Sequence, residues 1–260
     1  MPLMKETLHL MASKVRDAER SLPRSYDRSQ ELYQGADGTP TCSIDKVAED
    51  VILRMVEERD LPFNVLSEEA GYLDRGKSRT LVIDPIDGTY NSIMGMPFYS
   101  VSLAIGTESL SDVEFGLVQN LVTGDTYYAE RGRGAYLNGT PIRTRPFNPY
   151  KSVFIVYLGK YASADNFHLA RMGVRARALG CASLEMCLLA EGRADAYYMN
   201  CEVYERSIRV VDIAASALIL REAGGEIVDL MGRPLDMRFD LAERSNFIAY
   251  GDEEVRKVVM

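Results

Sequence analysis

The chain has 260 residues, a formal net charge of −8 and 47% hydrophobic residues. This length fits one large domain or two fused halves, and the apolar fraction allows a sizeable core. The negative charge makes nucleic acid an unfavourable partner. No apolar run reaches transmembrane length and no signal-peptide pattern occurs, so the sequence predicts a cytoplasmic protein without a membrane partner.

The chain has few residues suited to histidine or thiol chemistry. Only His9 and His168 occur, and His9 is expected on the surface of the first helix. This scarcity argues against histidine as acid, base or nucleophile, whereas grouped carboxylates favour metal-activated water. The cysteines lack the paired spacing of a zinc site and are expected to be buried thiols rather than disulfides. They are Cys42, Cys181, Cys187 and Cys201.

Two amphipathic helices are predicted in the first quarter of the chain. Apolar residues recur at spacings of three and four from Leu8 to Leu22, and Pro23 is expected to end this helix. The same spacing runs from Ile44 to Met55. Residues 35–40 between them contain glycine, aspartate and proline, so we expect a mobile loop there.

A strand-rich segment follows these helices. Residues 99–105 alternate with a period of two, and residues 113–121 and 127–130 continue the sheet. Asn138-Gly139 favours a tight hairpin turn. From about Lys151 strands and helices alternate, which indicates mixed α/β structure. The elements expected there are helices 182–190 and 212–223 and strands 195–199 and 225–230.

The most informative segment is residues 84–89, Asp-Pro-Ile-Asp-Gly-Thr. It follows the apolar residues 80–83, which favour a buried strand, and its proline is expected to end that strand. Two carboxylates this close repel each other unless a cation lies between them, and such hard oxygen ligands suit Mg²⁺. The Gly88 and Thr89 amides can face an anion. An ordinary Asp-Gly turn explains the last aspartate alone, but not the whole hexapeptide.

Two further segments carry carboxylates suited to the same site. Residues 64–66 favour a short strand, and Glu68 and Glu69 follow it, which gives a second acidic pair at a strand end. A solvated acidic loop is the alternative for such a pair. Asp212 stands before an apolar helical run, where a favourable interaction with the helix dipole explains it equally well.

Together these segments resemble the inositol monophosphatase family, whose members are Mg²⁺-dependent, lithium-sensitive phosphatases. The family carries a Glu-Glu segment, an Asp-Pro-Ile/Leu-Asp-Gly-Thr segment and an aspartate before a small-residue helix. Here these are residues 67–69, 84–89 and 211–215, in the same order, and the resemblance covers nearly the whole chain. Residues 35–41, followed by Asp45, resemble the mobile loop of archaeal members, which often hydrolyse both inositol phosphate and fructose 1,6-bisphosphate.

The resemblance implies the layered α/β/α/β/α sandwich of the inositol monophosphatase and fructose bisphosphatase superfamily. It also implies an N-terminal α+β half, residues 1–150, that carries the metal-binding motifs. The C-terminal α/β half, residues 151–260, would add the substrate-side helix and the third metal-ligand segment. A homodimer is implied as well.

The resemblance further implies two or three Mg²⁺ ions. The implied ligands are Asp37, Glu68, Glu69, Asp84, the Ile86 carbonyl, Asp87 and Asp212. Asp84 would be shared by the first two ions, and Glu68 by the first and the third. Asp37 would arrive with the mobile loop and complete the third and weakest site.

Catalytic and substrate-binding residues are implied in the same way. Thr89, paired with Asp45, would orient or deprotonate the attacking water beside the catalytic metal ligand Glu68. The implied substrate contacts are Asp87, Gly88, Thr89, Arg177, Gly180, Cys181, Ala182, Glu205 and Arg209. For the two arginines, a surface ion pair explains the sequence equally well.

The expected reaction is hydrolysis of a small phosphate monoester, inositol 1-phosphate and also fructose 1,6-bisphosphate. An NADP(H) or nucleotide 3′-phosphate phosphatase of the same superfamily would fit the same metal ligands. A positively charged pocket at Arg177 and Arg209 would favour a bisphosphate. A non-catalytic phosphate-ligand-binding protein is the remaining alternative, but unused grouped carboxylates would destabilise such a protein.

Overall fold

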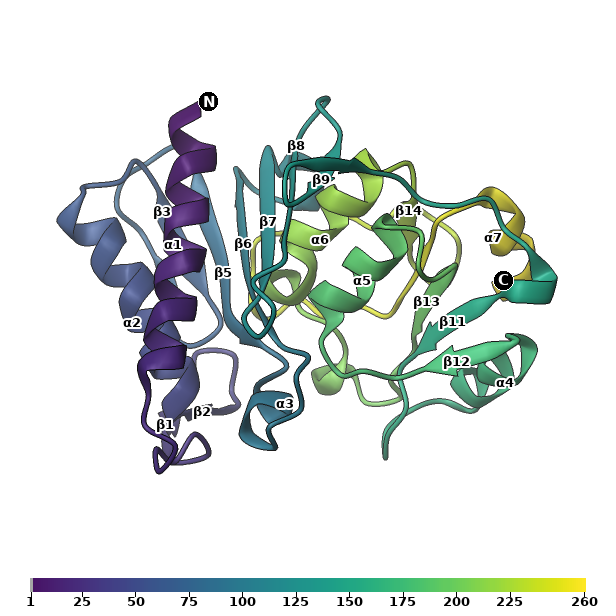
Figure 1. Ribbon diagram of the computed structural model, residues 1–260, viewed down its shortest axis with the longest axis horizontal. Coiled ribbons are helices and arrows are strands. Elements are labelled where there is room, and N and C mark those ends of the chain that lie inside the picture. Colours follow the sequence, from purple (N-terminus) through teal and green to yellow (C-terminus); the bar gives the residue numbers. More distant parts are fainter. Residues whose placement is uncertain (1) are drawn as a thin grey trace.

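A computed structural model describes residues 2–260 and places two β-sheets between layers of helices (Figure 1). This order of layers confirms the predicted α/β/α/β/α sandwich. Within residues 2–260, no helix is both long enough and apolar enough to cross a membrane. The layers are α1 (Pro2–Ser21) with α2 (Ser43–Glu58), an eight-stranded sheet, α5 (Ala182–Ala190) with α6 (Val210–Glu222), a five-stranded sheet, and α4 (Ala164–Met172) with α7 (Glu253–Val259).

The two predicted N-terminal helices form the first layer. Leu8, Met11 and Val15 of α1 are fully buried and pack with Ile44 and Ile52 of α2 over the first sheet. The spacing of three and four therefore marks the buried face of each helix. The first helix ends at Ser21, two residues before Pro23, as the proline predicted.

The prediction that His9 lies on the surface is wrong. Its ring is partly buried and packs edge-on against Tyr128, with ring centroids 5.0 Å apart. Burial lowers the pKa of His9, and the nearby Lys5 lowers it further. His9 therefore belongs to the contact between α1 and the sheet and lies apart from the candidate site described below.

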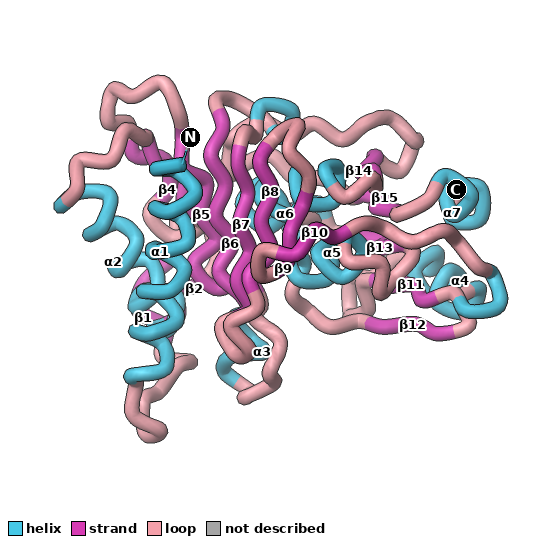
Figure 2. The backbone as a smooth tube through the Cα atoms, turned by 45° about the horizontal axis from the view of Figure 1, so that its top comes forward, coloured by secondary structure: helices cyan, strands magenta, loops and turns pink. Residues whose placement is uncertain are grey.

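The eight-stranded sheet brings two of the acidic motifs together. In spatial order its strands are β10 (Thr140–Ile142), β9 (Ala135–Leu137), β8 (Thr126–Glu130), β7 (Phe115–Asn120), β6 (Ser100–Gly106), β5 (Thr80–Asp87), β3 (Asn64–Ser67) and β4 (Gly71–Leu73). Figure 2 shows β5, β6, β7 and β8 side by side. β3 and β5 run parallel, with Ser67 opposite Ile83, so the next residues, Glu68 and Asp84, are neighbours.

Two local predictions for this sheet have different outcomes. Asn138 and Gly139 join β9 to β10 with φ values of 50° and 83°, which confirms the tight hairpin turn. Pro85 does not end its strand, because β5 continues to Asp87. The pairing with β6 becomes irregular between Asp84 and Asp87, and this irregularity accommodates a residue without an N–H.

Helices α5 and α6 form the central layer. Residues 210–220 of α6 are all buried, because the helix contacts β6 and β7 of the first sheet on one side and β14 (Glu226–Val228) on the other. A helix enclosed in this way is apolar all round. It begins at Val210, two residues earlier than predicted, so Asp212 lies within its first turn.

The five-stranded sheet and a small hairpin complete the fold. The sheet contains β12 (Arg175–Arg177), β11 (Val153–Val156), β13 (Ala196–Met199), β15 (Phe247–Tyr250) and β14, in that order. The predicted strands at 195–199 and 225–230 are present but shorter. The other elements are β1 (Glu31–Gln34), β2 (Pro40–Cys42), α3 (Thr89–Ile93) and 3₁₀ turns at Leu110–Asp112, Pro149–Lys151 and Tyr204–Arg206.

A single cluster of buried apolar residues connects the parts of the chain before and after residue 150. Val118 and Tyr127 of the first sheet belong to it, as do Leu184 of α5 and Ile213 of α6. The two expected halves therefore share a core. All four cysteines are free thiols, and three of them are buried, as expected.

Candidate active site

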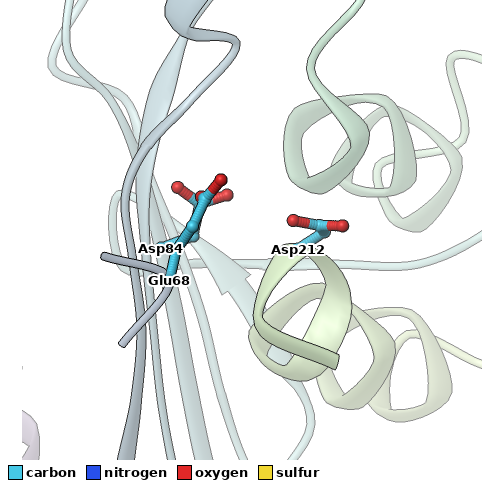
Figure 3. A group of neighbouring side chains, drawn as sticks. All are labelled: Glu68, Asp84 and Asp212. Carbon is cyan, nitrogen blue, oxygen red and sulfur yellow. The ribbon is translucent and has the colours of Figure 1, made fainter. Parts of the chain in front are cut away.

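Glu68, Asp84 and Asp212 bring three carboxylates together from separate parts of the chain (Figure 3). Glu68 directly follows β3, Asp84 lies in the adjacent parallel strand β5, and Asp212 lies in the first turn of α6. Asp212 points from α6 toward the other two side chains. One oxygen atom from each residue lies within 4.8 Å of the others. We call these residues the three-carboxylate cluster.

The chemistry of the three-carboxylate cluster fits a divalent cation. Asp84 Oδ1 is buried and has no hydrogen-bond partner within residues 2–260, whereas buried polar atoms are normally paired. Burial raises the pKa of Asp84 and of Glu68, and neighbouring carboxylates raise both further. Carboxylate oxygens are the ligands that Mg²⁺ prefers in proteins. The cluster therefore has both the ligand type and the unsatisfied acceptor that a cation needs.

Asp87 lies beside this cluster, but its carboxylate faces the start of α5. Its Oδ2 accepts hydrogen bonds from the Ser183 backbone N–H at 2.6 Å and from the Cys181 thiol at 3.2 Å. Its Oδ1 accepts one from the Ala182 N–H at 3.2 Å. These bonds connect the end of β5 to α5. In the structure Asp87 is therefore not a member of the group whose oxygens converge.

Thr89 and Asp45 lie together on the other side of the motif. Thr89 Oγ1 is 2.9 Å from Asp45 Oδ1 and 2.9 Å from the Ile86 carbonyl oxygen. Burial raises the pKa of Asp45 to about 6. Gly88 before them has a φ of 86°, and a Cβ there would lie 3.2 Å from the Gly180 carbonyl oxygen. Only glycine fits this position without strain.

Residues 35–39, expected to be mobile, form a closed loop between β1 and β2. Asp37 accepts hydrogen bonds from the Thr39 N–H at 2.8 Å and from the Thr39 hydroxyl at 2.9 Å. The Ala36 N–H donates to the Glu69 carbonyl at 3.0 Å. The loop is thus held against the segment that follows β3.

The Glu69 carboxylate faces this loop rather than the three-carboxylate cluster. It accepts a hydrogen bond from the Thr41 hydroxyl of β2. Burial raises the pKa of Glu69 to about 7. Its position suits a residue that fixes the loop and lies next to a cation ligand.

Arg209, expected to contact phosphate, is held by carboxylates in the structure. Its Nη2 lies 2.7 Å from Asp212 Oδ1, and its Nη1 forms ion pairs with Asp37 and Glu68. The side chain is 18% exposed. Two of these partners belong to the three-carboxylate cluster, and the pairs are largely buried, so the alternative of a surface ion pair does not describe them.

A cavity of about 400 Å³ opens beside the cluster. Asp87, Arg209 and Asp212 are among its lining residues. The predicted substrate segment also lines it, at Gly180, Cys181 and Ala182, together with Asn91, Met96, Tyr157, Leu158, Glu185 and Tyr197. The cavity therefore joins the cluster to the N-terminal end of α5.

Two predicted substrate residues lie elsewhere. Arg177 is exposed, does not line the cavity and donates to the carbonyl of Ala176 at 2.7 Å. Glu205 lines a second, smaller recess of about 200 Å³, together with Arg206 and Arg244. The two cavities share the lining residues Ile208, Arg209 and Asp212.

Sequence reasoning missed Glu185 and Asn91, which shape the cavity wall. The Leu179 N–H donates to Glu185 Oε1 at 2.6 Å, and burial raises the pKa of this carboxyl to about 7. Asn91 Nδ2 donates to the carbonyls of Phe98 and Leu179 at 2.8 and 2.7 Å. A glutamate inside the largely apolar helix 182–190 was the available signal for the first of them.

The model of the inositol monophosphatase family matches residues 5–256. The chain belongs to this family. It is 34% identical to the fructose-1,6-bisphosphatase/inositol-1-monophosphatase of Methanothermobacter thermautotrophicus, over 96% of this chain and 92% of that protein. It is 33% identical to the bifunctional NADP phosphatase/NAD kinase of Methanococcus maripaludis, over 98% of this chain, but spans only 49% of that relative.

Solved structures of the inositol monophosphatase family share this fold. A Pyrococcus horikoshii protein described as similar to inositol-1 monophosphatase has a TM-score of 0.85 and 31% identity, covering 99% of this chain and 97% of that one. The structure of an inositol monophosphatase–fructose 1,6-bisphosphatase has a TM-score of 0.84 and 32% identity, covering 98% of this chain and 97% of that one. As a member of this family the protein is a phosphatase, a phosphoric monoester hydrolase.

Proposed function

We propose that this protein is a Mg²⁺-dependent phosphatase of inositol 1-phosphate that also hydrolyses fructose 1,6-bisphosphate. One observation carries the proposal. Three carboxylates converge within 4.8 Å beside a cavity of about 400 Å³, and a buried oxygen of one of them, Asp84, has no partner among residues 2–260. Such a group suits a cation, and the adjacent cavity has room for a small phosphate ester.

Glu68, Asp84 and Asp212 would hold the Mg²⁺ ions, two or three in number. Further ligands would come from Asp37 and the Ile86 carbonyl, and from Glu69 and Asp87 once these carboxylates leave their present hydrogen bonds to Thr41 and Ser183. When bound, the ions would supply activation of a water molecule and neutralisation of the phosphoryl charge.

Thr89 and Asp45 would handle the proton of the attacking water. When Thr89 donates its hydroxyl proton to Asp45, its oxygen is free to accept a hydrogen bond from water. As the water oxygen bonds to phosphorus, the bond from phosphorus to the ester oxygen would break, and the leaving alcohol would take a proton from solvent. The proton of the attacking water would pass to Thr89, and the Thr89 proton to Asp45. A carboxylate whose pKa burial raises to about 6 is ionised at neutral pH and ready to accept it.

The cavity residues would bind the rest of the substrate. The Gly88 and Thr89 amides at the end of β5 would hold phosphate oxygens. The Gly180 segment would contact the leaving group, held in place by Asn91 and Glu185.

The charge of the cavity wall favours a substrate with one phosphate. Among the described residues, Arg209 is the single cationic side chain that lines it, and carboxylates already pair with this side chain. Inositol 1-phosphate presents hydroxyl groups away from its phosphate and fits such a wall. Fructose 1,6-bisphosphate is the second candidate, because Arg206 and Arg244 line the adjoining recess and neither forms an ion pair within residues 2–260. NADP⁺ is a third candidate, given the name of the Methanococcus relative.

A turnover screen with matched Thr89 variants tests the proposal. Phosphate release is measured with inositol 1-phosphate, fructose 1,6-bisphosphate, NADP⁺ and adenosine 3′,5′-bisphosphate, with Mg²⁺ and with a chelator. We expect Thr89→Val to lower kcat on the order of 10²–10⁴-fold, because it removes the proton path and keeps the shape. Thr89→Ser keeps the hydroxyl and should retain most activity.

Equal activity in the Thr89→Val and parent proteins would place the reaction elsewhere. Turnover that persists in chelator would remove the role of Mg²⁺. The order of kcat/KM among the substrates decides between the three candidates. We also propose that the protein is a homodimer, and sedimentation velocity measures its oligomeric state.

A further inference from the structure

Arg209 joins three parts of the candidate site that are far apart in the sequence. It directly precedes α6, and its guanidinium contacts Asp212 in the first turn of that helix. It also contacts Glu68 after β3 and Asp37 in the loop of residues 35–39. One side chain thus links the loop, the sheet and the helix.

Arg209 makes several close contacts, and the side chains of its carboxylate partners are largely buried. Arg209 Nε lies 3.0 Å from Asp212 Oδ1, and its Nη2 lies 2.7 Å from the same atom. The side chain of Asp37 is fully buried, and that of Glu68 is 13% exposed. Charge-assisted hydrogen bonds in such surroundings are stronger than pairs on an open surface.

The same oxygen atoms are those that a metal ion would use. Glu68 and Asp212 belong to the three-carboxylate cluster, and Asp37 is the loop carboxylate that lies next to it. Arg244 does not share this role, because its guanidinium donates to the carbonyls of Leu241 and Asp37. A cation that binds Glu68 and Asp37 must therefore compete with the Arg209 guanidinium.

We propose that Arg209 is a positioning residue that competes with the cation held by Glu68 and Asp37. Its positive charge weakens this cation site and at the same time ties residues 35–39 to the cluster. This inference rests on the proposed metal-dependent function. On this proposal Arg209 is the reason that the third cation site is weak. When no cation is bound there, Arg209 is also the positive charge that holds Asp37 of the loop.

Direct cation binding tests the proposal without turnover. Mn²⁺ binding is measured by electron paramagnetic resonance for the parent, Arg209→Gln, Arg209→Lys and the control Arg206→Gln, and Mg²⁺ by competition. We expect Arg209→Gln to tighten the weakest site at least about tenfold, because a competing charge is removed. Arg206 is exposed and forms no ion pair within residues 2–260, so its variant should bind like the parent.

Amide hydrogen exchange of residues 35–39 gives the second readout. Without added cation, exchange should be faster in Arg209→Gln than in the parent, and Mn²⁺ should slow it again. Lysine keeps the charge, but one ammonium group cannot bridge three carboxylates as a guanidinium does. Arg209→Lys should therefore give intermediate affinity and intermediate exchange, and it carries the test if the glutamine variant does not fold.

The outcomes separate this inference from the proposed function. If the parent binds Mn²⁺ and Arg209→Gln binds it equally or more weakly, Arg209 does not compete and the inference is overturned. A rise in substrate KM with unchanged Mn²⁺ affinity would make it a phosphate contact instead. If the parent binds no Mn²⁺ at the cluster, the proposed function fails and the inference with it.

Discussion

Two aspartates three residues apart in one motif have different surroundings. Asp84 joins the three-carboxylate cluster and has an oxygen without a partner within residues 2–260. Asp87 accepts hydrogen bonds through both of its carboxylate oxygens from the first residues of α5. The difference arises because β5 is irregular between them, so their side chains point to different neighbours. A substitution of either one therefore tests a different contact.

The raised pKa of Glu185 should make the free energy of unfolding depend on pH. Burial raises its folded pKa from an ordinary value of 4.5 to about 7. Between these values the folded protein keeps a proton that the unfolded chain releases, so this group lowers stability as pH rises through that window. The full cost above the window is on the order of 3 kcal/mol.

The variant Glu185→Gln should lose this contribution. Urea unfolding from pH 5 to pH 8 measures it, and the parent should lose more stability over this range than the variant. Glu254→Gln is the control, because Glu254 is an exposed residue of α7. Parallel curves for the parent and Glu185→Gln would show that this carboxyl is not stabilised in its protonated form.

Element packing decides where the metal ligands meet. The parallel pairing of β3 with β5 aligns Glu68 with Asp84, and the packing of α6 on the same sheet supplies Asp212. The approach of α6 depends on Gly116 of β7. A Cβ at this position would lie 2.6 Å from the Ala215 carbonyl oxygen and 3.0 Å from its Cα.

Gly116→Ala should therefore destabilise the protein. The new methyl group meets helix backbone, which cannot rotate away as a side chain can, and we expect a loss of about 1–3 kcal/mol. The urea midpoint measures this loss. Gly159→Ala is the matched control, since the nearest atom to its Cβ would be 3.7 Å away. Equal midpoints for the two variants would mean that α6 shifts without cost.

At the scale of the whole molecule, the cluster lies between elements from the two expected halves of the chain. Glu68 and Asp84 come from the first half and Asp212 from the second, and the same buried core spans both. A cation that binds all three would stabilise their packing together. The boundary at residue 150 remains a proposal about chain organisation, and the homodimer remains a proposal about assembly.

Mg²⁺ should raise the melting temperature of the whole protein in one transition. A ligand that binds only the folded state adds about 2.7 kcal/mol when its concentration is 100 times Kd. For a chain of this size this corresponds to a shift of several degrees. Calorimetry with MgCl₂ and with KCl of equal ionic strength measures it, and Asp212→Asn should reduce the shift. Identical melting curves in the two salts would contradict cation binding at the cluster.

The sequence by itself determined the family, the layered fold and most secondary-structure elements. The spacing of apolar residues is a local property that a few neighbouring positions reveal. Leu8, Met11 and Val15, for example, mark the buried face of their helix. The hexapeptide at 84–89 combines residue types that rarely occur together. Element ends were less accurate, because a proline such as Pro85 can be accommodated by an irregular strand pairing.

The tertiary structure alone decided which side chains are partners. Arg209 contacts Asp37 although 172 residues separate them, and Asp87 contacts Ser183 across 96 residues. The raised pKa of Glu185 follows from the burial of α5 between the sheets, which the sequence does not show. No local pattern encodes such pairs, since they depend on how β5, α5 and α6 pack. Packing also fixes the charge of the cavity, because it pairs Arg209 with carboxylates and leaves Arg177 at the surface.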